Sequence, residues 1–427
     1  MTQNSPTLVR TIGRASLTAL MVNSIIGVSI FRLPSDLAAK LGGFSPLSCL
    51  GAGAGILIVA ACIAEVSSYH QDTGGLYLYA RDALGQFAGL LVAWLTWLAR
   101  IAAPAAAANL FYTYLSQFFP WLRSGPVELL VLTFLIGHLA LLNYIGVKTG
   151  KIVSNLFAVI KVSFLMLFVL AGLLAIVLRP DIRVPLTFHE VSSASWFQSL
   201  LLLVYAYGGF EGALFVGGET ENPKRDTPIA LLSALILVAA IYTAVQFVTI
   251  LTLPNASATV SPLYEAALRF VGPTGATAIA VGALVSAYGY LSANLLHAPR
   301  ITYALAQQGD FPRFLGTVHP KFRTPYVSIL IYALLVFAFA ALGTFQWNAV
   351  LSAVSRLAVY GAMAIAVPVL RRIRPGEGQF LLPAANLFAS LGILFSIILL
   401  TQMGRSEFLV VGTTCSIAFV NWIAVRR

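Results

Sequence analysis

Residues 23–31 (NSIIGVSIF) and residues 205–211 (YAYGGFE) decide the fold of this chain, because each stretch interrupts a long apolar run. Each places polar and small residues about halfway through a predicted membrane span, where a lipid-facing helix would carry leucine. The pair Gly208-Gly209 lowers helix propensity by about 2 kcal/mol in water. Any backbone that opens in hydrocarbon must find hydrogen-bond partners in protein, water or a solute. The two stretches therefore predict interrupted helices beside a binding site near the bilayer midplane.

The composition requires a membrane protein. Of 427 residues, 59% are hydrophobic and 10% are charged, whereas a soluble domain carries about 25% charged residues. At about 20 apolar residues per spanning helix, this composition allows on the order of twelve spans. Residues 129–142 and 164–178 are apolar all round, which excludes a transmembrane β-barrel because its strands alternate apolar and polar residues.

Apolar windows of about 20 residues predict an all-α membrane protein with twelve transmembrane helices. The windows lie near residues 15–36, 45–69, 84–116, 127–145, 152–178, 196–220, 229–253, 274–304, 325–343, 347–371, 380–402 and 406–425. Between the seventh and eighth windows, residues 261–271 predict a short amphipathic helix, because Leu263, Ala267 and Phe270 fall on one face.

The two interruptions fall in the first and sixth windows, which begin two successive units of five helices. This spacing indicates a 5+5 inverted repeat with broken helices 1 and 6 and two extra helices. The alternative is that the glycines only allow close helix packing. We expect one transmembrane domain over residues 1–427, with repeat one at about 12–178, repeat two at about 196–372 and helices 11–12 at about 380–425.

The distribution of Lys and Arg predicts which side of the membrane each loop faces. Twelve spans place both termini on one side. If that side is cytoplasmic, sixteen Lys and Arg residues face the cytoplasm and seven face outside: Arg32, Lys40, Arg123, Arg179, Arg183, Arg269 and Arg405. The bias predicts a multi-pass protein of the cytoplasmic (inner) membrane with both termini cytoplasmic.

Other kinds of site find no support in the sequence. Cys49, Cys62 and Cys415 lie in apolar segments and form no disulfide framework or metal motif. The five histidines have no ligand spacing, and no paired catalytic groups share one depth, so we expect no metal, no cofactor and no enzyme activity. The net charge is +11. We attribute the excess of basic residues to cytoplasmic loops and not to a nucleic-acid-binding surface.

Several motifs occur in order between about residues 10 and 372. They are residues 27–31 (GVSIF), similar to GSGIF; residues 205–211, similar to FAYGGFE; residues 64–65 (AE) with 74–81 (GGLYLYAR); residues 219–225 (ETENPKR); residues 300–304 (RITYA); residues 309–312 (GDFP); and residues 319–322 (HPKF). By these motifs the chain resembles the amino acid, polyamine and organocation superfamily of transporters, which has the leucine-transporter fold.

The resemblance and the backbone chemistry imply the same substrate site. Freed N–H groups around residues 27–29 would hold a carboxylate with the help of a positive helix end. Freed carbonyls of residues 206–208, with those of residue 25 or 26, would hold an α-ammonium, and Tyr205 or Tyr207 would cover the substrate. Ser29 replaces the second glycine of GSGIF. The predicted substrate-binding residues are Ile25, Ile26, Gly27, Val28, Ser29, Tyr205, Ala206, Tyr207, Gly208 and Gly209.

Lys161 lies about 14 Å into the fifth span, at about 1.5 Å per residue, which is the depth of both interruptions. A buried ionisable residue in a membrane is functional by default, and a lysine can exchange protons there. In the superfamily, a lysine at this place resembles the feature of sodium-independent members, where it stands at a sodium site. Ser286 and Ser292 are its candidate partners. A snorkelling or static structural lysine is the alternative.

Four other charges need partners. In the superfamily the acid at the position of Glu211 anchors helix 6 and is a candidate for titration. Glu211 is therefore a second predicted coupling residue. The alternative is that Glu211 is a purely structural acid. Arg100 and Arg356 lie inside their windows and are interpreted first as gate or packing charges and second as substrate contacts. Glu65 is expected to close the cytoplasmic side with Arg81 or Arg300.

These observations predict a secondary active amino acid transporter that works by alternating access. It is expected to be sodium-independent, with proton coupling through Lys161 as an option. The alternatives are an amino acid exchanger and a polyamine or amine carrier. Expected partners are a small amino acid, protons and membrane lipids, with no nucleic acid, and the chain is expected to be a monomer or a homodimer.

Overall fold

The computed structural model describes residues 12–70, 75–123, 125–146, 151–212, 214 and 220–425, and only the backbone of residues 151–160. In these ranges the chain is helical, and a single isolated bridge joins Ile12 to Thr220. Residues 213 and 215–219, at the end of the predicted sixth span, lie outside the described residues. So do the predicted cytoplasmic charges Arg10, Lys148, Arg426 and Arg427.

Most helices of the described chain lie within predicted windows, but a short helix at residues 75–84 lies between the second and third windows, and the first window is divided. The helices are α1 (Arg14–Ile25), α2 (Leu33–Leu41), α3 (Ser45–Ser67), α4 (Gly75–Leu84), α5 (Gln86–Phe118), α6 (Gly125–Tyr144), α7 (Lys151–Leu178), α8 (Ser193–Tyr207), α9 (Pro223–Thr252), α10 (Pro262–Phe270), α11 (Pro273–Gln307), α12 (Tyr326–Leu342), α13 (Phe345–Ile373), α14 (Ala385–Leu400) and α15 (Arg405–Val425). The predicted amphipathic helix is confirmed as α10, with Leu263, Ala267 and Phe270 buried.

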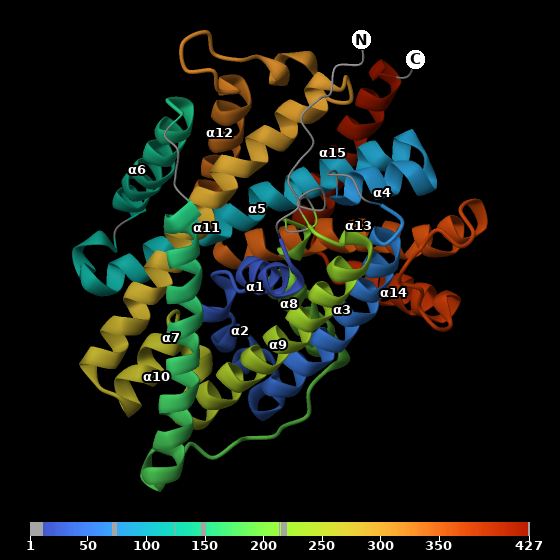
Figure 1. Cartoon of the computed structure of the whole chain (residues 1–427). Helices are drawn as coiled ribbons and strands as arrows, with labels where there is room; N and C mark the ends of the chain where they lie inside the picture. The colour runs from blue at the N-terminus through green and yellow to red at the C-terminus, as the bar shows by residue number, and fades with distance from the viewer. Residues whose placement is uncertain are drawn as a thin grey trace.

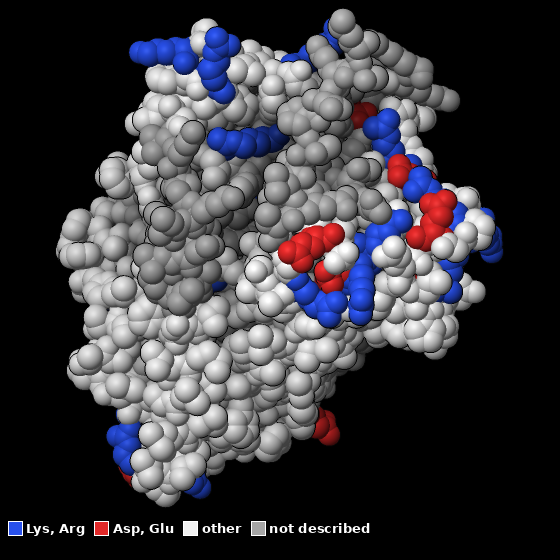
Figure 2. Space-filling model, in the orientation of Figure 1, with Lys and Arg blue, Asp and Glu red and all other residues white. Residues whose placement is uncertain are grey.

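The helices are apolar enough to identify a multi-pass membrane protein. Among the described residues, eight helical stretches meet the length and hydropathy of a membrane span, and α12 and α14 are shorter apolar helices. On α7, Leu167, Leu170 and Leu174 are 58–61% exposed, which suits a lipid-facing surface. Figure 2 shows charges at the upper and lower edges, on the right-hand side and in a group near the centre of this face, with uncharged surface at the lower left.

Helices α5 and α13 form the centre of the molecule. Their apolar windows are 78% and 72% buried, against 17% for α15. Helix α13 packs on α5, α3, α8 and α14, and α9 packs on α1 and α3. Figure 1 shows α1, α2 and α8 in the middle of the molecule, with α7 running lengthwise to their left. The two interrupted stretches are therefore enclosed by long helices from distant parts of the chain.

Candidate functional site

The first interruption separates α1 from α2. The N–H of Ile26 makes the last α-helical hydrogen bond of α1, 2.9 Å to the carbonyl of Val22. Ile26 then leaves the helix with ψ 86°, and Gly27 and Val28 lie outside any helix. A short 3-10 turn, η1 (Ser29–Phe31), leads to α2. The N–H groups of this loop therefore do not belong to an α-helical ladder, as the sequence predicts.

The second interruption follows α8 and requires its glycine pair. Gly208 is extended, with φ −73° and ψ 165°, and Gly209 has φ 117°, a conformation that favours glycine. A Cβ on Gly209 would collide with the carbonyl of Ser24, and a Cβ on Gly208 would lie 2.6 Å from Nη1 of Arg356. The two interruptions thus lie in contact, and only glycine fits where the end of α8 meets the end of α1.

Tyr242, in α9, joins the two interruptions. Its hydroxyl lies 3.2 Å from the carbonyl of Ile25 and 3.2 Å from that of Ala206. Its ring packs against Tyr207 at a centroid distance of 5.4 Å. The sequence predicts both carbonyls as free acceptors but gives no indication of Tyr242, because it lies in no motif.

The two tyrosines predicted to cover the substrate lie in different surroundings. Tyr207 is fully buried, and its hydroxyl donates to the carbonyl of Cys49 in α3 at 2.7 Å. Tyr205 packs edge-on against Phe345 at 6.0 Å. On the opposite side, the ring of Tyr290 in α11 would lie 3.8 Å from a Cβ on Gly27. Tyr290 is therefore a second aromatic residue beside the interruptions that sequence reasoning missed.

Glu211 holds the second interruption against α13. Nη1 of Arg356 lies 2.5 Å from both carboxylate oxygens, and the hydroxyl of Tyr360 also donates to Glu211. The N–H of Gly209 donates to the same carboxylate at 2.7 Å. Both charged side chains are buried, so each depends on the other for charge compensation. The partner that Arg356 needs inside the membrane is thus Glu211.

Arg100 lies close to the same cluster. Its carbonyl accepts a hydrogen bond of 2.5 Å from Tyr332. Its Nη2 would lie 3.7 Å from a Cβ on Gly212, which follows Glu211 in the chain. The two arginines predicted inside the membrane therefore both lie near the second interruption.

Lys161 and Ser286 contact the first interruption from α7 and α11. The ammonium of Lys161 is buried and donates to the carbonyl of Asn23. Ser286 Oγ donates to the carbonyl of Gly27 at 3.3 Å. These carbonyls lie at the end of α1 and just beyond it, so Lys161 and its predicted partner Ser286 approach the same short stretch of backbone.

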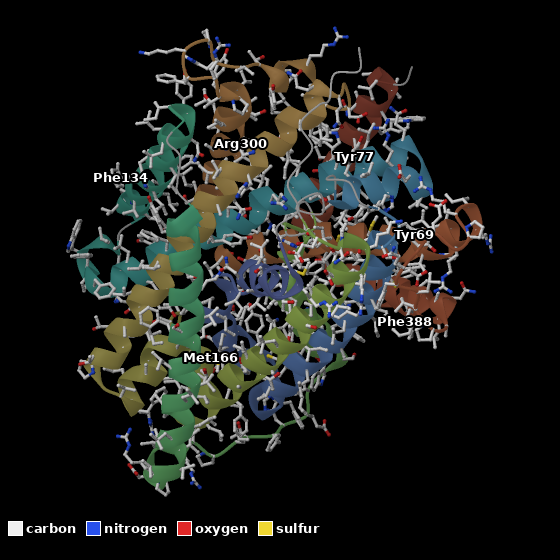
Figure 3. All side chains as sticks on the ribbon, in the orientation of Figure 1. Tyr69, Tyr77, Phe134, Met166, Arg300 and Phe388 are labelled. Atoms are coloured by element: carbon white, nitrogen blue, oxygen red, sulfur yellow. The ribbon has the colours of Figure 1, made fainter. Side chains whose placement is uncertain are left out.

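Glu65 has a different partner from those expected. It forms a two-pronged ion pair with Arg371 of α13, at 2.5 Å and 2.9 Å, because the end of α13 lies beside the end of α3. Arg81 pairs instead with Asp310 at 3.2 Å. Figure 3 shows Arg300 on α11 well apart from Tyr69, just beyond the end of α3.

Helix α4 is tied to the segment after α11 through Tyr77. Its hydroxyl donates to the carboxylate of Asp310. Burial, followed by this hydrogen bond, raises the pKa of Tyr77 to about 12, so the phenol remains protonated near neutral pH. Asn421 of α15 donates to the carbonyl of Asp310 at 2.7 Å, which adds the last helix to the same contact.

Comparisons with known proteins agree on one family. A model of the family "Amino acid permease" matches residues 12–424. The chain is 28% identical to a methylthioribose transporter of Bacillus subtilis, over 87% of this chain and 83% of the relative. It is 29% identical to the serine/threonine exchanger SteT of the same organism, over 75% and 74%. It is 25% identical to the branched-chain amino acid permease BcaP, also of that organism, over 94% and 90%.

Proposed function

The chain belongs to the amino acid permease family, and from this premise we propose that it is a secondary active amino acid transporter that works by alternating access. The proposal includes a single transmembrane domain of twelve spans, in which α1 with α2 is the first span and α8 begins the sixth. Spans one to five and six to ten would form the inverted repeat, and α14 and α15 would be the two extra helices. The order of the observed helices supports this assignment.

One observation carries the proposal: the ends of α1 and α8 meet in the middle of the molecule. Tyr242 contacts the carbonyls of Ile25 and Ala206, and Gly209 touches Ser24. A zwitterionic amino acid fits this junction, because backbone N–H groups at residues 27–29 suit its carboxylate. Carbonyls at the end of α8 suit its ammonium, and Tyr205 is the better placed of the two tyrosines to cover it.

Sodium-independent transport with proton coupling is the second part of the proposal. The Lys161 ammonium donates to the carbonyl of Asn23, in the way a bound cation would contact backbone oxygens. A lysine that loses its proton loses this charge, and its hold on the end of α1 weakens. Ser286 on Gly27 supports the neighbouring backbone. Glu211, the other predicted coupling residue, pairs with Arg356 of α13 and belongs to the proposal as a candidate for titration.

Two other transport functions are alternatives to this proposal. One relative is named a serine/threonine exchanger, which favours testing obligatory exchange. Another is named a methylthioribose transporter, so an amine or other small solute is the second alternative. A solute without a carboxylate would leave the N–H groups at residues 27–29 unused, and transport of such a solute would exclude the amino acid assignment.

Reconstitution in liposomes tests the function. Radiolabelled neutral amino acids are offered with an imposed proton gradient, an imposed sodium gradient or neither. We expect saturable uptake that the inward proton gradient stimulates and sodium leaves unchanged. A sodium requirement would contradict the role of Lys161, and efflux that needs external amino acid would assign the protein as an exchanger.

Variants make the coupling test specific. Lys161→Ala should retain binding of the amino acid and lose the dependence of uptake on pH. Ser292→Ala is the matched control, because Ser292 also lies on α11 but the serine that contacts Gly27 is Ser286. Full pH-dependent uptake by Lys161→Ala would exclude coupling through this residue.

A further inference from the structure

A buried histidine lies just beyond the end of α3 and has no role in the proposed transport site. His70 is only 7% exposed, and its backbone N–H donates to the carbonyl of Ser67 at 3.1 Å. The ring of Tyr79 in α4 lies against its ring at a centroid distance of 4.6 Å. The imidazole is therefore held in one position between the end of α3 and α4, where a change in its charge affects both helices.

Both ring nitrogens of His70 face oxygen atoms that accept hydrogen bonds. Nδ1 lies 3.0 Å from the carbonyl of Val66, and Nε2 lies 3.1 Å from Oδ2 of Asp82 in α4. A neutral imidazole has one N–H donor and one lone pair, whereas an imidazolium has two donors. A neutral ring would therefore direct its lone pair at a carbonyl or carboxylate oxygen. Both contacts are hydrogen bonds only when the pair of His70 and Asp82 holds an additional proton.

A second histidine, His138 in α6, shows the contrasting arrangement. Its Nδ1 lies 2.8 Å from the carbonyl of Phe134, and its Nε2 lies 3.2 Å from the hydroxyl of Tyr288. A hydroxyl donates as well as accepts, so a neutral His138 satisfies both contacts. Of these two histidines, only His70 has contacts that depend on a proton.

Asp82 also connects the histidine to the end of α13. Its Oδ2 accepts a hydrogen bond of 3.4 Å from Nη2 of Arg374, the residue that follows α13. This arginine opposes a second positive charge on His70. Its side chain is 35% exposed, however, and that of Asp82 is 27% exposed, so water screens the repulsion. Arg81, the neighbour of Asp82 on α4, is directed instead at Asp310, at 3.2 Å.

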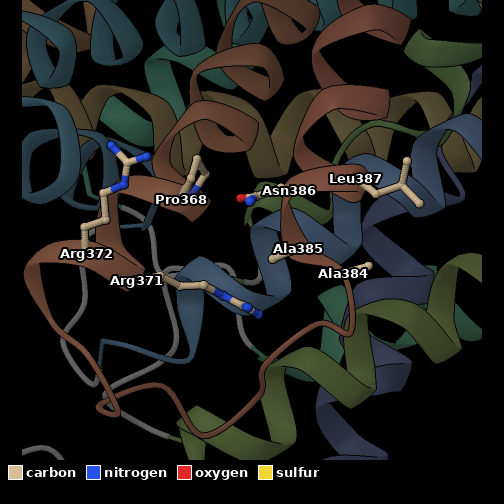
Figure 4. A pocket seen from close by; sticks show the side chains of 7 residues that line it. All are labelled: Pro368, Arg371, Arg372, Ala384, Ala385, Asn386 and Leu387. Carbon is tan, nitrogen blue, oxygen red and sulfur yellow. The ribbon is translucent and has the colours of Figure 1, made fainter.

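The charges on the α3 side of His70 balance one another. Glu65 of α3 is bound to Arg371 in the ion pair described above, and Arg371 lines the cleft shown in Figure 4. Tyr69, which precedes His70 and is labelled in Figure 3, is uncharged near neutral pH. Glu377, in the loop after α13, lies near Tyr69 and is exposed. Asp82 is therefore the acid that contacts the imidazole directly.

We propose that His70 and Asp82 form a proton-dependent latch at the end of the molecule where α13 ends. With the proton bound, Nε2 donates to Asp82, which also holds Arg374, so that the ends of α3, α4 and α13 are tied together. Histidine loses its charge between about pH 5 and pH 8, so the contact with Asp82 is present at low pH and is lost as the pH rises.

The latch regulates transport through the opening of this end. Alternating access requires the end to open, so acid on this side slows the opening and a higher pH releases it. This effect on transport rests on the proposed function, whereas the latch itself is a property of the fold and is tested separately.

Hydrogen–deuterium exchange of the purified full-length protein tests the latch. Protection of the amides at the ends of α3 and α4 is measured by mass spectrometry at pH 6 and pH 8, with correction for the pH dependence of chemical exchange. We expect the wild type to lose protection roughly tenfold at pH 8, the effect of one charge-assisted hydrogen bond. In His70→Gln a neutral amide donates to Asp82 at either pH, so its protection should not change.

Two further variants make the exchange test specific. His138→Gln is the matched control and should lose protection at the ends of α3 and α4 as the wild type does. Asp82→Asn should also abolish the pH dependence, because an amide accepts from the charged ring and donates to the neutral one. It provides the test if His70→Gln does not fold. Constant protection in the wild type, or an equal loss in the wild type and Asp82→Asn, would overturn the proposal.

Uptake into liposomes that hold the protein in one orientation tests the effect on transport. The pH of the compartment that α4 faces is set to 6 or 8, and the pH of the other compartment is fixed. Acid should slow the wild type more than Asp82→Asn, and since both retain Lys161, the difference between them reports the latch. An equal response would overturn the regulation of transport. If no amino acid is carried, the proposed function fails, and the exchange measurement still decides whether the latch exists.

Discussion

At the scale of single residues, Gly209 decides whether the ends of α1 and α8 can meet. Its φ of 117° suits glycine, and a Cβ would collide with the carbonyl of Ser24. Gly209→Ala should destabilise the protein by at least about 1–2 kcal/mol from the backbone alone, and should abolish uptake. Gly137→Ala, on α6 and away from the proposed substrate site, is the matched control, since a Cβ there meets no atom within 4 Å. Thermal unfolding and uptake are measured for both, and a Gly209→Ala protein with wild-type stability would contradict the geometry.

The buried pair of Glu211 and Arg356 gives a second prediction. Glu211→Gln leaves the arginine buried without a countercharge, which costs about 3–5 kcal/mol. The melting temperature should fall sharply, and the double variant Glu211→Gln with Arg356→Met should recover part of the loss. Glu190→Gln, at an exposed acid, controls for the change of an acid to an amide. If the double variant recovered no stability, the unpaired charge of Arg356 would not be the cause of the lower melting temperature in Glu211→Gln.

At the scale of elements, Tyr242 connects α9 to the ends of α1 and α8. Tyr242→Phe retains the ring that packs on Tyr207 but removes both hydroxyl contacts. The stability should fall by only about 1 kcal/mol, while uptake should fall at least tenfold because the two ends lose their common anchor. Tyr112→Phe, which removes a single hydroxyl contact to Leu122, is the control. Equal uptake by the two variants would contradict this role of Tyr242.

The sequence predicts where the elements begin and end better than it predicts how they face one another. The interruptions follow from local chemistry, because Gly208-Gly209 and the polar residues near Gly27 weaken a helix wherever it packs. Partners such as Arg371 for Glu65 depend on how far each helix is rotated about its axis, which pairs residues 306 positions apart. The role of Tyr242 could not be predicted for the same reason. The sequence of an apolar helix that contains a buried tyrosine does not indicate which neighbouring helix its hydroxyl contacts.

At the scale of the whole molecule, long helices hold two short and irregular stretches in a polar contact network. Helices α5 and α13 are the most buried of the candidate spans named above, and α13 supplies both Arg356 and Arg371. A tilt of α13 would therefore affect the second interruption and the ion pair with Glu65 together. This gives a physical route by which the proposed substrate site and one end of the molecule would change in concert, as the proposed alternating access requires.

The orientation of the molecule gives the last prediction. The excess of Lys and Arg in one set of loops predicts that the segment with Arg313 faces the cytoplasm and that the link before α8 faces outside. In a background without native cysteines, a membrane-impermeant maleimide should label Glu190→Cys in intact cells and label Arg313→Cys only in inverted vesicles. Both positions are exposed, so a failure to react reports the membrane barrier and not burial. The opposite labelling pattern would show that the predicted topology is reversed.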